Sequence, residues 1–584
     1  MTGVTAGASN SRYPCTGYAG MELWNPTRQV VTDHYRWGTY PVVRVGDGSG
    51  NINWRLDPFR QPSWHAILHS LRWLGQPIRE WRANPSANAP QIAHVTTIVR
   101  DWIRDNPYPW GSAVGAGSAT MYRTNTLLCL REAVVEVEGS APAWLDASLV
   151  QHSSWLRANE WLDHNIGTDR NLALLGIGCV LDRPADRDLA VARLATAIGR
   201  VVDAQGANNE QSPGYADWNH TLWGKVDRAV EACHVDTAAA EIIPAKRSAL
   251  QSFLDRSTGP DGRLSPLGDT SNAARLDPSR SSAQRWLASN GRAGQPPTDR
   301  VQIYRAGYVF GRSGWGTGSS RLSSPAAQSA YSIRFGAVRA GHGHHDHMSV
   351  TWTAAGQPVL VDPGFGEYTW DAWRRYAISA PAHNMVLVGS QTTTPATSLV
   401  RSRVRPGGDF FELRDTVGRS SVRRRSVLVM SNPEVMLVYD RVANPPRSTT
   451  FSQLWHLPPG LRATSLKGGV VTNPGSQGRR TWILQVPLTS RFSPAVARVI
   501  RGSTRPVQGW YWSDNAHRWA APVVSLTRSG RSAAFLTAVV ADPASRVNVT
   551  RIAGSRSIAK YLLRIGSRNV RVSVSSDGTL TRLG

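Results

Sequence analysis

Four histidines lie close together between residues 341 and 347, in the segment GHGHHDH. The chain has 15 histidines in all, so this density sets the segment apart. On a β-strand, the side chains of His342, His344 and Asp346 would project from one face. Imidazole and carboxylate groups on one face are typical of a metal site. The alternative is a solvated loop whose affinity for metals is incidental.

Two further segments offer side chains that could complete a metal site. Asp362 stands where an apolar run ends in a Pro-Gly turn, in VLVDPGFGEY. His383 stands just before another apolar run, in APAHNMVLV. Two neutral imidazoles and one carboxylate from neighbouring strands are a suitable set of ligands for tetrahedral zinc. We therefore expect a metal ion between the histidine-rich segment, Asp362 and His383.

A polar segment in the first half of the chain is a second place where chemistry is expected. NNEQSPGYADWNH, at residues 208–220, interrupts a helix-rich region and carries Glu210, Gln211, Tyr215 and His220. We interpret it as a structured polar loop that contributes to a site. The alternative is a long turn between two helices.

Two more polar loops have simpler alternatives. LDHNIGTDRNLALL, at 162–175, places His164, Asn165 and Asp169 at the start of an apolar helix. Asn is a common N-cap, so capping is the alternative role for Asn165. PDGRLSPLGDT, at 260–270, is rich in Gly and Asp, as ordinary turns are.

Two kinds of secondary structure must hold these segments. In the first half, apolar residues recur at helical spacing, and turns such as NPYPWG separate the runs. Serial helix pairs without a strict repeat favour a toroid of diverged hairpins over a regular solenoid. The helical runs are 63–75, 92–106, 124–137, 147–162, 170–181, 188–205 and 241–256.

After Val301 the pattern changes to alternating apolar and polar residues between Gly, Pro and Asn turns. This alternation, continued to the C-terminus, predicts a large antiparallel β-sandwich. We therefore predict an α+β multidomain chain with a toroid domain at 1–290, a linker at 291–300 and a sandwich domain at 301–584. A cleft between two such domains is a favoured place for a ligand.

The net charge indicates which partners suit the chain. Lys and Arg number 66 against 41 Asp and Glu, a formal charge of +25. Such a field favours polyanions, and Arg forks grip carboxylates and sulfates. A high-GC genome would also raise the Arg content, so the charge supports an acidic substrate without establishing one. The basic residues are spread out and no nucleic-acid motif is present, so we expect no nucleic acid.

The remaining composition bears on compartment and ligand. The 23 Trp and 15 Tyr can stack on sugar rings or fill a core. No stretch is apolar enough for membrane insertion, and no signal peptide is visible. Because signal peptides are often removed, we expect a secreted, periplasmic or cell-surface protein, with a cytoplasmic one as the alternative. The oligomeric state is not readable.

Four cysteines, Cys15, Cys129, Cys179 and Cys233, are few for 584 residues. An even count allows two disulfides in a secreted protein. Cys129 and Cys179 lie in apolar runs and are interpreted as buried free thiols. No metal role is expected for any of the four.

Several motifs together resemble a known family. HGHHDHMSV, LVDPGFGEY and WRRYAISAPAHNMVLV, in this order, resemble the signature of heparinase II/III-like polysaccharide lyases. EQSPGY and PDGRLSPLGD resemble loops of that family's helical domain. The resemblance spans roughly residues 50–460. It implies an incomplete (α/α) toroid joined to a β-sandwich, and β-elimination of a uronic-acid-containing polysaccharide.

The resemblance also implies roles for single residues. Tyr215 and His342 match a catalytic tyrosine and histidine, and Tyr368 matches a second active-site tyrosine, with Tyr376 a weaker choice. Asn165 matches an Asn that neutralises the substrate carboxylate. This chain reads Asn-Ile-Gly there, so the family's usual His is absent.

Binding residues follow from the same resemblance. His344, Asp362 and His383 match the ligands of a structural zinc ion. Glu210, Gln211 and Arg374 are expected to bind substrate. The implied partner is an acidic polysaccharide or oligosaccharide.

The proposed chemistry needs these residue types. Removing the C5 proton of a uronic acid requires donors aimed at the charge that spreads into its carboxylate. A base takes the proton and an acid protonates the leaving O4, and Tyr215 and His342 can divide these tasks. Which of them is the base stays open.

Two other functions compete with this one. A glycoside hydrolase needs two carboxylates, for which Glu210 and Asp269 could be proposed. A non-catalytic protein that binds acidic glycans would also account for the charge and the Trp content.

Overall fold

The computed structural model describes residues 13–14, 21–114, 117–140, 142–318, 323–445, 447–489, 493–555 and 557–583. The chain divides into two compact units. Unit 1 comprises Met1–Val202 and Asn219–Ser248, and unit 2 comprises Asp203–Trp218 and Ala249–Gly584. The border after Val202 directly follows a helix, and the borders after Trp218 and Ser248 fall inside helices. All three lie away from the boundaries expected at residues 290 and 301. The division into domains at residues 290 and 301 therefore remains a prediction.

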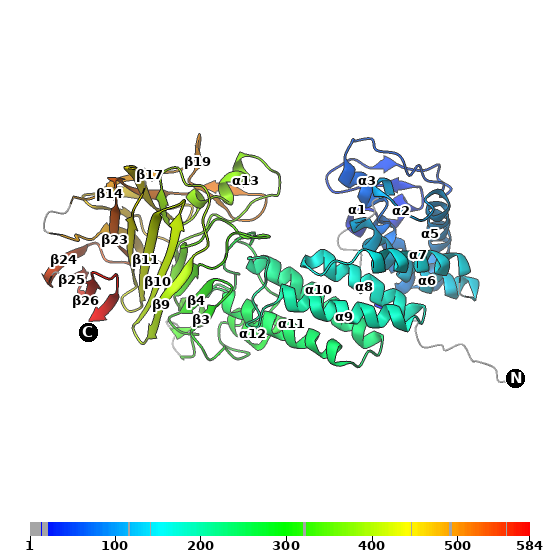
Figure 1. Ribbon diagram of the computed structural model, residues 1–584, viewed down its shortest axis with the longest axis horizontal. Helices are drawn as coiled ribbons and strands as arrows, with labels where there is room; N and C mark the ends of the chain where they lie inside the picture. Colours follow the sequence, from blue (N-terminus) through cyan, green and yellow to red (C-terminus); the bar gives the residue numbers. More distant parts are fainter. Residues whose placement is uncertain are drawn as a thin grey trace. The chain divides into compact units, whose positions relative to one another are not determined.

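Unit 1 is largely helical (Figure 1). Its helices are α1 (Met21–Trp24), α2 (Thr27–Val30), α3 (Pro62–Leu68), α4 (Gly75–Ala83), α5 (Pro85–Asp105), α6 (Ser118–Glu138), α7 (Ala143–Ala158), α8 (His164–Val180), α9 (Pro184–Val201) and parts of α10 (Pro213–Ala232) and α11 (Ala238–Ser257). A short pair of strands, β1 (His34–Tyr35) and β2 (Val43–Arg44), precedes α3. All seven expected helical runs overlap helices, which confirms the helical first half.

The helices bury one apolar face each, as α5 illustrates. Ile92, Val95, Ile98, Val99 and Trp102 recur every three or four residues and are all buried. This spacing places them on one stripe of the helix, where they contribute to the core of unit 1.

Helix α10 corrects the prediction for residues 208–220. The polar loop ends at Ser212, and the helix begins at Pro213. Proline suits the first helical position, because the amide it lacks would have no partner inside the helix there. Tyr215 therefore lies in the first turn of a helix rather than in a loop.

Arg123 is fully buried in unit 1 and is held by polar and aromatic groups. Its Nε donates to Nε2 of His152 at 2.9 Å, and its Nη1 donates to the carbonyl oxygen of His69 at 2.9 Å. The guanidinium carbon also lies 4.0 Å from the ring centre of Trp102 and 4.7 Å from that of Trp110. Aromatic faces and hydrogen bonds thus stabilise this buried cation.

A disulfide joins Cys179 and Cys233 within unit 1. Cys129 is also disulfide-bonded. The interpretation of Cys129 and Cys179 as free thiols is therefore wrong, although both side chains are buried as expected. Cys15 lies outside the described residues.

Unit 2 holds antiparallel sheets (Figure 1). A five-stranded sheet runs β3 (Val301–Tyr304), β4 (Tyr308–Arg312), β5 (Ala330–Arg334), β6 (Val350–Ala354), β7 (Gln357–Leu360). An eight-stranded sheet runs β14 (Ala463–Leu466), β15 (Gly469–Thr472), β16 (Arg480–Gln485), β23 (Ala533–Asp542), β12 (Val435–Ala443), β11 (Ser421–Met430), β10 (Gly408–Val417), β9 (Ser398–Arg405).

Two four-stranded sheets complete the large layers of unit 2. One runs β17 (Val496–Ile500), β22 (Val523–Gly530), β13 (Thr449–His456), β8 (Val386–Val388), and the other runs β24 (Val547–Gly554), β25 (Ile558–Ile565), β26 (Arg568–Ser575), β27 (Leu580–Leu583). Smaller pairs are β18 (Ser503–Thr504) with β19 (Val507–Gln508) and β20 (Trp510–Trp512) with β21 (Arg518–Ala520). Helices α12 (Ser282–Ala288) and α13 (Ala372–Ala377) also belong to this unit.

The eight-stranded sheet is apolar on both faces. In β11, Val427 and Val429 enter a core shared with the five-stranded sheet and with β13 and β22. Leu428 and Met430 enter a second core, shared with the C-terminal sheet β24–β27. Because successive strand residues face opposite sides, a continuous apolar run is what two cores require. The alternation expected from sequence therefore does not hold for this strand.

In the part of the chain that the structure describes, no helix combines the length and apolarity needed to cross a bilayer.

Candidate active site

Three loops of unit 2, at residues 208–212, 264–270 and 340–347, meet through their backbones. The amide of His342 donates to the carbonyl of Glu210 at 2.9 Å, and the amide of Asp269 donates to the carbonyl of His342 at 2.8 Å. Gly268 has a φ of +57°, and a Cβ there would lie 2.6 Å from the carbonyl oxygen of His342. Only glycine fits this approach, which explains the PLGD sequence.

The histidine-rich segment is not a strand. Residues 341–347 form turns and irregular backbone between β5 and β6. His342 and His344 nevertheless reach the same partner, because their rings contact the two oxygens of Asp269. Asp346 points elsewhere and forms a buried ion pair with Arg334 at 3.3 Å. The expectation that His342, His344 and Asp346 share a strand face is therefore wrong.

Asp269 is the centre of the polar cluster and is only 4% exposed. Its carboxylate contacts Nδ1 of His342 at 2.8 Å and Nε2 of His344 at 2.9 Å. Arg374 donates to both carboxylate oxygens, at 2.6 and 2.9 Å. Burial raises the pKa of Asp269, but the hydrogen bonds from both histidines and from Arg374 outweigh it and lower the pKa. The carboxylate is therefore a fixed negative charge behind the two imidazoles.

Two tyrosines lie against His342. The ring of Tyr215 stacks on the imidazole, with 3.3 Å between the ring centres and an 8° angle between the planes. The Tyr215 hydroxyl is 3.0 Å from the hydroxyl of Tyr368, which is 53% exposed. Burial raises the pKa of both phenols, and the charge of Asp269 adds to the effect. Both tyrosines are thus neutral proton donors at neutral pH.

Glu210 and Gln211 lie beneath this group. Oε2 of the buried Glu210 is 3.5 Å from Nε2 of His342. The Gln211 side chain donates to the carbonyl of Val338 and accepts from the amide of Ala340, at 3.0 and 2.9 Å. Gln211 thus holds the backbone that leads into the histidine-rich loop.

Arg374 and Tyr376 are both on α13 but have different surroundings. The Arg374 guanidinium binds Asp269 and lies 5.1 Å from the ring centre of Tyr368. Tyr376 is buried in a separate aromatic cluster with Trp512. Tyr368, rather than Tyr376, is therefore the second tyrosine of the group around His342.

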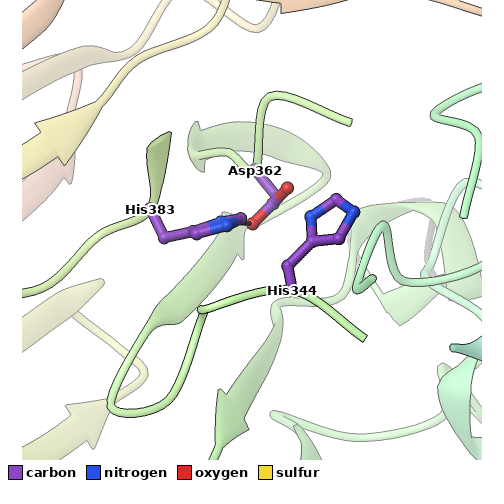
Figure 2. A group of neighbouring side chains, drawn as sticks. All are labelled: His344, Asp362 and His383. Carbon is purple, nitrogen blue, oxygen red and sulfur yellow. Dashed lines mark hydrogen bonds and ion pairs between the residues drawn. The ribbon is translucent and has the colours of Figure 1, made fainter. Parts of the chain in front are cut away.

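His344, Asp362 and His383 form a buried group that could hold a metal ion. One potential ligand atom from each lies within 4.8 Å of the others, and Figure 2 shows the side chains gathered together. Nδ1 of His383 contacts Asp362 at 2.7 Å. Nδ1 of His344 and Nε2 of His383 are buried with no hydrogen-bond partner among the described residues. Buried imidazole nitrogens without a hydrogen-bond partner are free to bind a metal ion. Together with the Asp362 carboxylate they fit zinc, which binds imidazole and carboxylate ligands.

Asn165 lies in unit 1, apart in sequence from the group just described. It is in the first turn of α8 and is partly buried. The N-cap of α8 is Asp163, so the capping alternative for Asn165 does not apply. Asp169, four residues further on, has a pKa raised to about 6 by burial, against the charge of Lys225.

The second half of the chain matches a known family. Residues 310–550 match the family model described as Heparinase II/III-like, C-terminal. These residues are therefore similar to the C-terminal domain of heparinase II/III-like proteins. This heparinase II/III-like domain contains His342, Tyr368 and the three metal-ligand candidates, whereas Tyr215 and Asp269 precede it. The family resemblance read from the motifs is confirmed.

Solved structures share the fold along nearly the whole chain. The heparan sulfate lyase HepC from Pedobacter heparinus is 15% identical, with a TM-score of 0.72 over 99% of this chain and 91% of that one. A heparinase III is 15% identical, with a TM-score of 0.76 over 97% and 94%. Another heparinase III, with methylated lysines, is 13% identical, with a TM-score of 0.77 over 97% and 93%. Curated proteins yield no match.

The similarity to these solved structures establishes the fold. A helical N-terminal region followed by antiparallel sheets, with an incomplete (α/α) toroid and a β-sandwich, is confirmed. Asp269 is the central residue that sequence reasoning weighed only as a hydrolase carboxylate. The available signal was its place in PLGD, one of the motifs that carry the resemblance.

Proposed function

We propose that the protein is a polysaccharide lyase that cleaves a uronic-acid-containing acidic polysaccharide by β-elimination. The observation that carries this proposal is the contact of Tyr215, Tyr368 and Asp269 with one imidazole, that of His342. These groups can accept and donate protons, so the reaction does not need the two flanking carboxylates of a hydrolase. The HepC and heparinase III structures, named as a heparan sulfate lyase and heparinases, support the same class.

The geometry favours one division of the proton transfers. With Nδ1–H of His342 donating to Asp269, Nε2 carries the lone pair and can take the C5 proton. Tyr215, kept neutral by its raised pKa, can then protonate the leaving O4. We assign Gln211 and Arg374 to positioning, because both side chains bind the protein itself. Asn165 stays proposed for the substrate carboxylate on its sequence motif alone.

We also propose that His344, Asp362 and His383 hold a structural zinc ion. Their orphaned nitrogens support this assignment. When bound, the ion would cross-link the loop that carries His342 to the ends of β7 and of the segment before β8, because metal binding stabilises the folded arrangement of its ligands. No proton transfer in the proposed mechanism needs it.

The disulfides support a secreted or periplasmic location. Cys179 and Cys233 are bonded, and such bonds persist in oxidising compartments. A location outside the cytoplasm also fits a polymeric substrate.

A hydrolase fits the site less well. Both oxygens of Asp269 already bind an imidazole and the Arg374 guanidinium, so this carboxylate has no free position for a sugar. The deciding experiment is a panel of acidic glycans followed by ultraviolet absorbance. A lyase leaves an unsaturated, absorbing end. New reducing ends without absorbance would establish the hydrolase instead, and no cleavage of any glycan would favour a binding protein.

A further inference from the structure

A cavity of unit 2 lies outside the group around His342. It has a volume of about 120 Å³. Its wall comprises the end of α11, the loop at 258–266, the strands β4 to β7 and Tyr511. A single water needs only about 10–15 Å³, so the cavity takes a group of several non-hydrogen atoms.

Arg312, at the end of β4, lines this cavity and is only 4% exposed. Its guanidinium carbon lies 3.8 Å from the ring centre of Trp315. Among the described residues, the guanidinium has no ion pair and no hydrogen bond; only the main chain of Arg312 is bonded, to Arg300. Burial lowers the pKa of Arg312 to about 9, against the opposing charge of Asp261.

Other deeply buried arginines of unit 2 have their own carboxylate. Arg334 pairs with Asp346, and the remaining three pairs are Arg374 with Asp269, Arg423 with Asp415 and Arg425 with Asp440. Arg123 of unit 1 lacks a carboxylate but has hydrogen bonds and two aromatic faces instead. A buried charge without such partners is costly. Among the buried arginines that the structure describes in unit 2, Arg312 is the one without an ion pair, which leaves a counter-charge to be supplied.

The other two arginines of the wall have carboxylate partners. Arg256 and Arg263 also line the cavity, and the single carboxylate in the wall is that of Asp261. Asp261 pairs with Arg263 at 3.1 Å, and both are exposed. Arg256 lies 3.9 Å from the carboxylate of Asp299, so among the described residues Arg312 is the wall arginine without an ion pair, and its charge favours an anion.

We propose that this cavity binds an oxyanion, a carboxylate or sulfate group, through a forked contact with the Arg312 guanidinium. The planar guanidinium matches such groups with paired hydrogen bonds. The anion is either inorganic sulfate or the acid group of a sugar. The inference goes beyond the lyase proposal and does not depend on it.

The cavity is connected to the group around His342 by one loop. Leu264, Ser265 and Asn272 line the cavity, and the same stretch of chain carries Asp269. Asn272 is anchored by a hydrogen bond to the carbonyl of Trp512 at 2.8 Å. An anion bound at Arg312 would therefore contact the loop that sets the position of Asp269.

Binding can be measured on the full chain without any activity. The probes are sodium sulfate and sodium glucuronate, with glucose as the neutral control and sodium chloride at matched ionic strength. Thermal stability and Trp fluorescence report binding, since Trp315 lies against the guanidinium. We expect a saturable response to an oxyanion beyond that of chloride. Tighter binding of glucuronate identifies a sugar acid as the source, and tighter binding of sulfate identifies sulfate.

Variants locate the site. Arg312→Met should weaken binding about tenfold or more, because charge-assisted hydrogen bonds are lost. Arg312→Lys, which keeps the charge but not the fork, should weaken it less. Arg498→Met, at an exposed arginine on β17, is the control for net charge and should change binding by less than about twofold.

Three results would overturn the proposal. They are no saturable response beyond chloride in the unaltered protein, equal weakening in the Arg498→Met control, and undiminished binding by Arg312→Met. If Arg312→Met does not fold, undiminished binding by Arg312→Lys overturns it instead.

Discussion

Replacing Tyr215 with Phe separates the chemistry of its hydroxyl from the packing of its ring. The ring, stacked 3.3 Å from that of His342, is retained, and one hydroxyl is lost. The lost hydrogen bond to Tyr368, 3.0 Å long, joins two neutral groups and is worth about 0.5–1.5 kcal/mol. The free energy of unfolding should therefore fall by about 1 kcal/mol. If the hydroxyl transfers a proton, kcat should fall about 10²–10⁴-fold.

The two magnitudes are far enough apart to be decisive. A 10²–10⁴-fold loss is about 3–5 kcal/mol of barrier, several times the expected loss of stability. Initial rates of ultraviolet absorbance and a urea denaturation curve, taken on one preparation, measure both. Tyr368→Phe loses the same hydrogen bond and is the stability control. Tyr376→Phe, on α13 in a different cluster, should keep activity within a few-fold. A Tyr215→Phe enzyme within a few-fold of the unaltered protein would refute the assignment.

Four other perturbations follow from the same structure. His344→Ala should lower both thermal stability and activity and abolish zinc binding measured by elemental analysis; metal-free protein prepared without chelator would contradict the site. Asp269→Asn should cost about 3–5 kcal/mol of unfolding free energy, because it leaves the Arg374 guanidinium buried without its counter-charge. An unchanged denaturation midpoint would show that the Asp269 carboxylate does not stabilise the fold. Reducing the substrate carboxylates to alcohols should abolish cleavage, and KM should rise with salt; undiminished cleavage would exclude β-elimination. Reduction of the Cys179–Cys233 disulfide should lower stability by about 2–4 kcal/mol, as followed by helical circular dichroism; an unchanged melting curve would exclude a stabilising role.

The helical half and the strand-rich half were predictable because each follows a simple period. Apolar residues repeat about every 3.6 positions in α5 and every 2 positions in β6, and burial of one face imposes those repeats. Helix α10 was missed because its first turn carries polar residues of the site. The polar residues of this turn belong to the candidate site, so their polarity does not indicate a loop.

The site was predictable as a set of residues but not as a geometry. Motifs single out Tyr215, His342 and His344, yet nothing local shows that two imidazoles share the carboxylate of Asp269, more than 70 positions earlier. Nor does the sequence distinguish Arg312 from the other arginines of the β-strands. Among the described buried arginines of unit 2 it differs in having no ion-pair partner, and this depends on the packing of distant segments.

The strand order of the eight-stranded sheet has a consequence for synthesis of the chain. Val435 of β12 pairs with Val540 of β23, 105 residues later. At a ribosomal rate of about 5–20 residues per second, β12 waits roughly 5–20 s for its neighbour. During that time the edge of β12 is unpaired, and the apolar face that packs on β24–β27 is uncovered. Such edges recruit other chains. Nascent chains of this protein should therefore depend on a chaperone, or on slow release, until β23 has emerged.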